Sequence, residues 1–279
     1  MYADDTNITA VASNIHNLEL ILNNELSKLN NWLTSNKLSL NIAKTEFMLI
    51  GSRQKLATQT DSSINLDING NPIKQVKSSK SLGMIIDENL SWNEHINKIA
   101  KKASAGIGAL KRIRHLITEK TATKIFQALI QPYFDYCSEA WDGISNELSD
   151  KLQKLQNRAV RIITKSSFDT SAKPLISHLG LTNLANRRQF QIAKIMFKIL
   201  NKRSPKYLID LFCYKNNPRN LRNSEKKLVV PNPRTNYAMK SFGYKGAVTW
   251  NELPQNLRMS KTIHTFKKNF KQTQYSSGD

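Results

Sequence analysis

The chain has 279 residues, room for one large or two modest domains, and its 39% hydrophobic content is too high for a disordered chain. Forty-two Lys and Arg against 21 Asp and Glu give a formal net charge of +21. Residues 1–100 hold nine basic and ten acidic residues, whereas residues 101–279 hold 33 and 11. This asymmetry favours a polyanionic partner, with nucleic acid leading, over a basic surface that is merely solvated.

Several classes of protein are disfavoured by the same composition. Cys137 and Cys213 are the two cysteines and the five histidines are scattered, so neither a zinc site nor a disulfide framework is supported. No apolar run approaches the roughly 20 residues that span a bilayer, and the polar N-terminus does not read as a signal peptide. We therefore expect an intracellular protein of the nucleus or cytoplasm, with no membrane partner and no zinc.

The first 90 residues mix one long helix with short strands. From the N-terminus we expect a strand over 6–12, a helix over 15–33 capped by Ser13, strand pieces over 38–41 and 46–50, a loop over 52–63, a hairpin over 66–76 and a strand over 81–86. The hairpin is placed by Asn69-Gly70, which fits a type I′ turn. This order of elements predicts an α+β fold.

From about residue 91 the apolar period becomes helical. Helices are expected from 91 onward, over 148–165 and 183–202, and near 262–271, with a long polar loop over 215–236. Aromatic residues between 237 and 270 interleave with lysines, and they indicate a small core more strongly than a surface for base stacking.

The acidic pair Asp4-Asp5 is the first candidate for chemistry. Adjacent aspartates are usually solvated turn residues, and successive residues of a strand point to opposite faces. A magnesium ion is usually held by one or two carboxylates together with substrate phosphates, and two-metal phosphoryl transfer needs carboxylates from more than one strand. Asp87-Glu88 precedes a predicted helix and indicates favourable charge at a helix start.

The string Tyr2-Ala3-Asp4-Asp5-Thr6, an amphipathic helix ending in Trp32-Leu33, and then LSLNIAKTEFMLIG together resemble the palm domain of reverse transcriptases from non-LTR retrotransposons of the LINE or jockey type. The resemblance implies that Asp4 is the principal Mg²⁺ ligand and Asp5 a secondary one. It also implies that Lys44 contacts the incoming nucleotide's phosphates or donates a proton.

Further strings resemble the same family in the same order along almost the whole chain. SLGMIIDENLSWNEHI, residues 81–96, resembles the primer-grip strand and the entry to the thumb, with Leu82 and Gly83 as nucleic-acid contacts. Ser81 stands where the family usually has an aromatic residue. Residues 131–141, LQKLQNRAVRIIT at 152–164 and SFGYKGAVTWNELP at 241–254 complete the set.

The resemblance implies an incomplete palm over 1–90, a helical thumb over 91–165 and a basic, mainly helical region over 166–279. It implies an RNA-directed DNA polymerase that uses an RNA template, a DNA primer or target, and deoxynucleotides. Because the family carries a further catalytic aspartate upstream of this motif, we expect an incomplete fragment that is inactive alone. The alternatives are a non-catalytic nucleic-acid-binding remnant and a protein-interaction scaffold, of which the scaffold would need exposed apolar stripes rather than charge.

Cations recur on two predicted helices of the basic part. One set takes steps of three and four residues, which place its members on one helical face beside a core-facing stripe of Leu152, Leu155, Ala159 and Ile162: Lys151, Lys154, Arg158, Arg161 and Lys165. Lys101, Lys102, Lys111, Arg112 and Arg114 flank the first thumb helix, where the resemblance implies minor-groove contact. Arg187, Arg188, Lys194 and Lys198 form a less regular set. The ordinary alternative for each set is a solvated helix face.

Overall fold

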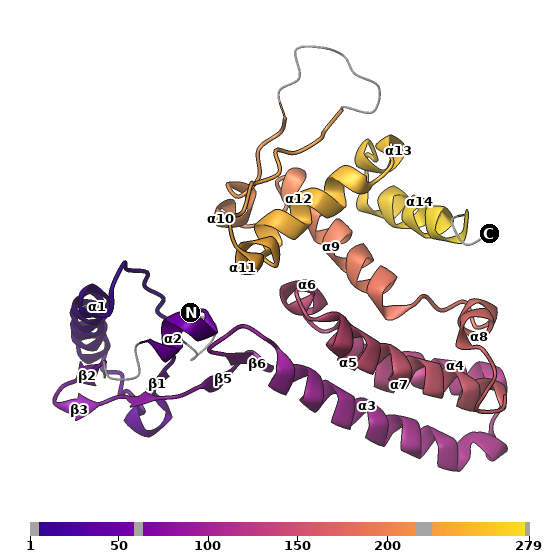
Figure 1. The fold of residues 1–279 in the computed structure, drawn as a ribbon, viewed down its shortest axis with the longest axis horizontal. Coiled ribbons are helices and arrows are strands. Elements are labelled where there is room, and N and C mark those ends of the chain that lie inside the picture. Colours follow the sequence, from indigo (N-terminus) through magenta and orange to yellow (C-terminus); the bar gives the residue numbers. More distant parts are fainter. Residues whose placement is uncertain (1–5, 59–63, 216–224, 277–279) are drawn as a thin grey trace. The chain divides into compact units, whose positions relative to one another are not determined.

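The computed structural model describes residues 6–58, 64–215 and 225–276 (Figure 1). The chain divides into two compact units, Met1–His95 and Ile96–Asp279. Residues 96–279 form one unit, so the predicted thumb and the predicted C-terminal region lie in the same body.

The first unit contains one long helix and three separate pairs of short strands. Its elements are α1 (Ile15–Ser35), η1 (Ile42–Lys44), β1 (Glu46–Phe47), α2 (Arg53–Ala57), β2 (Asp67–Ile68), β3 (Asn71–Pro72), β4 (Lys74–Gln75), β5 (Ser78–Ser81) and β6 (Met84–Asp87). Strands β1 and β4 pair in parallel, whereas β2–β3 and β5–β6 are antiparallel hairpins. The core lies where α1 meets the first hairpin and consists of buried Leu26, Ile64, Leu66, Ile68 and Ile73.

The predictions for this unit succeed where local chemistry is strong. The helix over 15–33 is confirmed as α1, although its N-cap is Asn14 rather than Ser13, because the Asn14 side chain accepts a hydrogen bond from the Asn17 amide at 2.8 Å. The Asn69-Gly70 turn is confirmed, since both residues have positive φ as a type I′ turn requires.

Other predictions for the first unit are wrong. No strand forms over 6–12 or 38–41, and the loop expected over 52–63 contains the short helix α2, which the Ser52 side chain caps. The single strand expected over 81–86 is instead a hairpin that turns at Leu82-Gly83, where both φ angles are positive. Backbone that needs positive φ is readily predicted at Asn-Gly but not at leucine.

The second unit is built from helices joined by loops, and its described residues form no named strand. It begins within α3 (Asn93–Ile113), whose first residues belong to the first unit. The elements that follow are η2 (Arg114–Leu116), α4 (Glu119–Ile125), η3 (Phe126–Ile130), α5 (Gln131–Asp135), α6 (Ser138–Trp141), α7 (Asn146–Thr164), α8 (Ala172–His178), α9 (Leu184–Leu200), α10 (Lys206–Ile209), α11 (Asn236–Met239), α12 (Phe242–Glu252), α13 (Gln255–Arg258) and α14 (Ile263–Ser276). Tyr214 and Leu228 form an isolated antiparallel bridge.

Helix α3 packs closely against the irregular helix that runs through α4, η3 and α5. A Cβ atom at Gly106 would lie 2.9 Å from Cγ1 of Ile130, so this crossing requires glycine. Segment η3 is a π-helical stretch just before Pro132, a residue that has no amide proton to continue the α-helical ladder. The buried Arg114 side chain ties the end of α3 to the end of α7, because its Nε donates to the Ile163 carbonyl at 2.7 Å.

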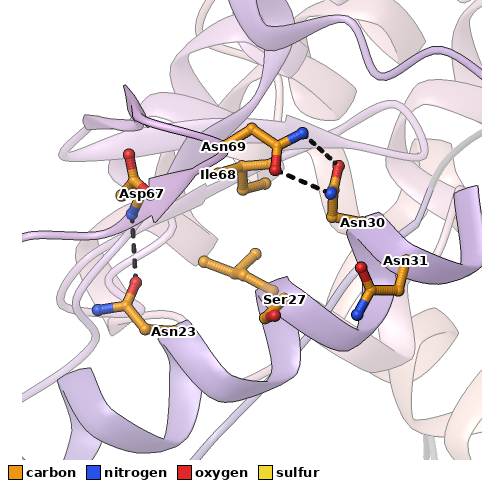
Figure 2. A pocket seen from close by; sticks show the side chains of 8 residues that line it. Asn23, Ser27, Asn30, Asn31, Asp67, Ile68 and Asn69 are labelled. Carbon is orange, nitrogen blue, oxygen red and sulfur yellow. Dashed lines mark hydrogen bonds between the residues drawn. The ribbon is translucent and has the colours of Figure 1, made fainter. Parts of the chain in front are cut away.

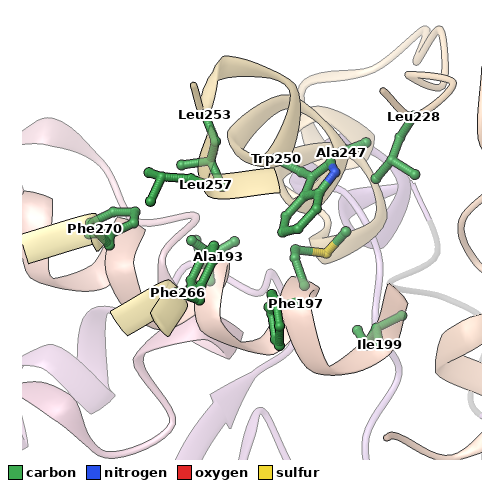
Figure 3. Packing of buried hydrophobic residues seen from close by; sticks show 12 residues of the cluster. Ala193, Phe197, Ile199, Leu228, Ala247, Trp250, Leu253, Leu257, Phe266 and Phe270 are labelled. Carbon is green, nitrogen blue, oxygen red and sulfur yellow. The ribbon is translucent and has the colours of Figure 1, made fainter. Parts of the chain in front are cut away.

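Helices α9, α12 and α14 share a hydrophobic core in the C-terminal part of this unit (Figure 3). Phe266 stacks near Trp250 and tilts against Phe197, with ring centroids 6.2 and 4.9 Å apart. Trp250, Phe266 and Phe270 are buried, which confirms the prediction that the C-terminal aromatics build a core, whereas Tyr237 remains exposed.

Candidate nucleic-acid interface

Helix α7 separates an apolar face from a basic one. Its buried residues are Leu148, Leu152, Gln156, Ala159, Val160 and Ile163, while the predicted stripe members Leu155 and Ile162 are only partly buried. Lys151, Lys154 and Arg158 are exposed, and no residue that the structure describes forms an ion pair with them, although Lys151 Nζ donates to Asn97 Oδ1 on α3 at 2.6 Å. These three cations span about 10 Å along the helix axis.

The two remaining members of the predicted α7 stripe have additional roles. Arg161 is partly buried, and its Nε donates to the Thr170 carbonyl at 2.7 Å, so it holds the loop after the helix. Lys165 caps the helix in the left-handed region with φ of 57° and stays exposed. The structure therefore leaves three cations on the body of α7 and places the other two at its end.

Helix α3 has an exposed face opposite its buried stripe. Lys101, Ala105, Gly108 and Arg112 follow one another at steps of four, three and four residues, which keeps them on one side of the helix. A Cβ atom at Gly108 would meet nothing within 4 Å. The face is thus smooth between two cations, and a phosphate backbone could approach it closely.

The other predicted cations of α3 flank this face. Lys111 is exposed beside Arg112, and Lys102 lies with Nζ 5.5 Å from the centroid of the Tyr133 ring. Arg114, by contrast, is buried and serves the packing of α3 on α7.

The basic set on α9 is largely structural. Arg187 forms an ion pair with Asp135, and buried Arg188 forms one with Asp142, which also accepts a bond from Lys245 Nζ at 2.7 Å. These pairs join α9 to the α5–α6 segment and to α12, so Arg187 and Arg188 are engaged within the unit. Sequence periodicity did not reveal the acidic partners of Arg187 and Arg188, because these lie 52 and 46 residues away along the chain.

In the first unit, Leu82 and Gly83 form the tip of the β5–β6 hairpin. Both are exposed, with φ of 46° and 85°. A leucine in this region is strained, because its Cβ atom lies too close to the following carbonyl oxygen. The structure thus presents an apolar side chain at an exposed turn.

Asp87, expected to favour the start of the next helix, instead holds the loop that precedes it. Its carboxylate accepts bonds from the backbone amides of Asn89, Ser91 and Trp92, the shortest at 2.7 Å. The loop contains two residues with positive φ, Leu90 and Trp92, which these bonds help to fix.

Lys44 ends the single turn η1 and is exposed. Asn41 organises this turn, because its side chain accepts from the Lys44 amide at 3.3 Å and its carbonyl from the Thr45 hydroxyl at 3.0 Å. Asp4 and Asp5 lie outside the described residues. Among the residues that are described, no group of three or more His, Cys, Asp or Glu side chains could hold a metal ion.

A polar hollow of about 400 Å³ lies between α1 and the β2–β3 hairpin (Figure 2). Asn30 and Asn69 bond to each other across it at 3.0 and 3.2 Å. Asn23 accepts from the Asp67 amide and donates to the Asn65 carbonyl, at 3.2 and 3.0 Å. Since the side chains of Asn23, Asn30 and Asn69 bond to one another or to the strand edge, their evident role is to join helix and hairpin.

One prominent residue of the second unit did not emerge from the sequence patterns. Phe168, in the loop between α7 and α8, is 92% exposed, and the Arg161 guanidinium carbon lies 5.8 Å from its ring centroid. Periodicity does not identify a loop residue, so only a search for aromatics among polar neighbours would have found it.

Comparison with known proteins gives two matches over about half of the chain. The chain is 22% identical over 139 residues to a probable RNA-directed DNA polymerase from the transposon X-element of Drosophila melanogaster, covering 49% of this chain and 14% of that protein. It is 23% identical over 146 residues to a retrovirus-related Pol polyprotein from the type-1 retrotransposable element R1 2 of Nasonia vitripennis, covering 50% of this chain and 35% of that protein. These similarities support a relation to retrotransposon reverse transcriptases.

No family model matches the chain, and no solved structure does. The matched segments make up well under two thirds of each relative. Within the described residues, every helix is too short or too polar to cross a bilayer.

Proposed function

We propose that this chain is a reverse transcriptase-related protein whose helical unit binds a primer–template duplex through the exposed cations of α3 and α7. The observation that carries the proposal is that Lys101, Arg112, Lys151, Lys154 and Arg158 are exposed on helix faces opposite buried stripes. The relation to retrotransposon polymerases makes nucleic acid the appropriate polyanion.

The arrangement on each helix suits phosphate rather than base recognition. Lysine and arginine heads on an exposed helix face neutralise backbone charge without reading sequence. The small residues Ala105 and Gly108 on α3 leave room for a backbone between the two cations. We therefore expect binding that depends strongly on salt and weakly on sequence.

In polymerisation, the resemblance assigns Asp4 and Asp5 as Mg²⁺ ligands and Lys44 as the contact to the phosphates of the incoming deoxynucleotide. Bound magnesium would neutralise charge that develops on the transferring phosphoryl group. Because the resemblance also requires a carboxylate from another strand, we propose that residues 1–279 alone bind a primer–template without extending it.

The binding proposal is tested by reversing charge on α7. Changing Lys151, Lys154 and Arg158 together to Glu should weaken binding of an RNA·DNA duplex. It should also reduce the slope of log affinity against log salt by about 2 to 3, because each lost phosphate contact removes about 0.9. Fluorescence anisotropy over a salt series measures both quantities.

The matched control is a triple change of the same charge elsewhere in the unit. Lys206, Lys215 and Lys261 are exposed on other segments, and their change to Glu alters the net charge equally. If the control weakens binding as much as the α7 variant does, only total charge matters and the interface is wrong. Template-dependent primer extension by the purified chain with magnesium would contradict the second part of the proposal.

A further inference from the structure

The turn after α7 carries an aromatic side chain that packs into no core. Phe168 is 92% exposed, while the residues around it are held firmly. A single exposed aromatic is ordinary on a protein surface. Phe168 differs in that its turn is fixed on both sides by hydrogen bonds.

On the N-terminal side the turn is fixed by the end of α7. The Ser166 amide donates to the Arg161 carbonyl at 3.0 Å, and the Thr164 and Ser166 hydroxyls lie 2.8 Å apart. Together with Lys165 in the left-handed region, these bonds form a Schellman-type helix end. The backbone that leads to Phe168 is therefore set by the helix.

On the C-terminal side the turn is fixed by the Arg161 side chain, which reaches it from the last turn of α7. Its Nε donates to the Thr170 carbonyl at 2.7 Å, and its guanidinium carbon lies 5.8 Å from the Phe168 ring centroid. The Ser167 hydroxyl bonds to the Asp169 carboxylate and lies 3.0 Å from the Thr170 hydroxyl. The ring is thus presented by an ordered turn with a guanidinium beside it.

The charge around the ring favours an anionic ligand. Residues 158–173 contain four cations and one carboxylate, and Lys165 and Lys173 are exposed on either side of the turn. The carboxylate, Asp169, is bonded to Ser167, and this bond holds its pKa below the ordinary value, so it remains charged. A phosphate is therefore disfavoured immediately beside Phe168 and favoured near the flanking lysines.

We propose that Phe168 is a stacking site for an unpaired base, and that single-stranded nucleic acid leaving the duplex held by α7 binds at this turn. Bases of a single strand can separate and expose their faces to an aromatic ring, whereas bases within a duplex are stacked on each other. The flanking lysines then bind the phosphates on each side of the stacked nucleotide. This inference rests on the proposed function, because it assigns a second ligand class to the turn that follows the same helix.

The test compares two probes on the full chain. A short fluorescein-labelled oligoribonucleotide and an RNA·DNA duplex of the same length are titrated with wild type, Phe168→Ala, Phe168→Leu and Phe168→Trp. Phe168→Ala should lower affinity for the single strand about fivefold or more, the range for loss of one base–aromatic stack. It should leave the duplex affinity and the salt slope unchanged, because no charge is removed.

The conservative variants separate stacking from general apolar contact. Phe168→Trp should retain single-strand affinity, whereas Phe168→Leu should lose it as Phe168→Ala does. Tyr207→Ala is the control for removal of an exposed aromatic elsewhere in the unit, since Tyr207 is 70% exposed, and it should have no effect.

Three results would overturn the inference: equal single-strand affinity of wild type and Phe168→Ala, full retention by Phe168→Leu, or equal loss for both probes. Unchanged RNA affinity accompanied by altered self-association in sedimentation would instead make the turn a protein contact, and would also overturn it. If wild type binds neither probe, the proposed function itself fails. If wild type binds both and Phe168→Ala matches it, only the stacking site fails.

Discussion

Replacement of Asp142 by alanine should strongly destabilise the second unit. The Asp142 side chain is 15% exposed and accepts bonds from Arg188 Nε at 3.0 Å and from Lys245 Nζ at 2.7 Å. Arg188 is 6% exposed, its Nη2 donates to the Ser149 hydroxyl, and its guanidinium lies over the Trp141 ring. Its Nη1 is buried and bonds to no described residue.

The magnitude follows from what remains after the carboxylate is removed. The guanidinium stays buried, and within the described structure Ser149 is its remaining hydrogen-bond partner. Removal of one member of a buried ion pair typically costs about 3–5 kcal/mol, because the other charge is left uncompensated. For a unit of this size we expect the melting temperature to fall by about 6–20 °C.

Urea denaturation followed by tryptophan fluorescence and far-ultraviolet circular dichroism measures the change in the free energy of unfolding. The matched control is Glu119→Gln, which removes an exposed partner of His178 in the same unit and should cost about 1 kcal/mol or less. The double variant Asp142→Leu with Arg188→Met should recover most of the loss, because the buried pair then carries no charge, while partly exposed Lys245 keeps its bond to the backbone carbonyl of residue 142. Equal costs for Asp142→Ala and the control would refute the assignment of a buried network.

Two further predictions concern packing and protonation. Gly106→Ala should lower the free energy of unfolding by up to about 2 kcal/mol, because the crowding of buried Ile130 outweighs the gain of about 1 kcal/mol in helix propensity. Gly108→Ala has open space around the new methyl group and should raise the free energy of unfolding by up to about 1 kcal/mol. A change of the same sign for both variants in urea denaturation would contradict the described packing of α3. Burial lowers the pKa of Lys194 below 10.5, so the unfolded chain binds more protons and the wild-type free energy of unfolding should rise with pH between the lowered pKa and 10.5. Lys194→Met should be more stable than wild type at neutral pH, with an advantage that shrinks across this window, and a constant difference in urea denaturation over the pH series would argue against desolvation.

Long helices and the Asn-Gly hairpin could be predicted from the sequence because their signals are local. Helix α7 repeats its apolar residues every three or four positions, and Asn69-Gly70 fits a single turn type. The hairpin at Leu82-Gly83 could not be predicted in this way, because leucine disfavours the positive φ that the turn imposes. Tertiary context has to supply that conformation.

The candidate interface was predicted in outline but not in detail. Periodicity placed Lys151, Lys154 and Arg158 on one face of α7, and that placement needs only helical geometry. The same periodicity could not distinguish them from Arg187 and Arg188, whose acidic partners are distant in sequence. Whether a cation is available to a ligand depends on contacts that become apparent only in three dimensions.

The bonds between α1 and the β2–β3 hairpin have a consequence for strand register. Asn23 uses its amide to complete the backbone bonds of Asn65 and Asp67, as a neighbouring strand would, and Asn30 bonds Asn69 two helical turns further on. A slip of the hairpin by one residue would break these bonds together and would turn Leu66 and Ile68 outward. The asparagines of α1 therefore select one alignment of a hairpin whose strands are too short to select it themselves.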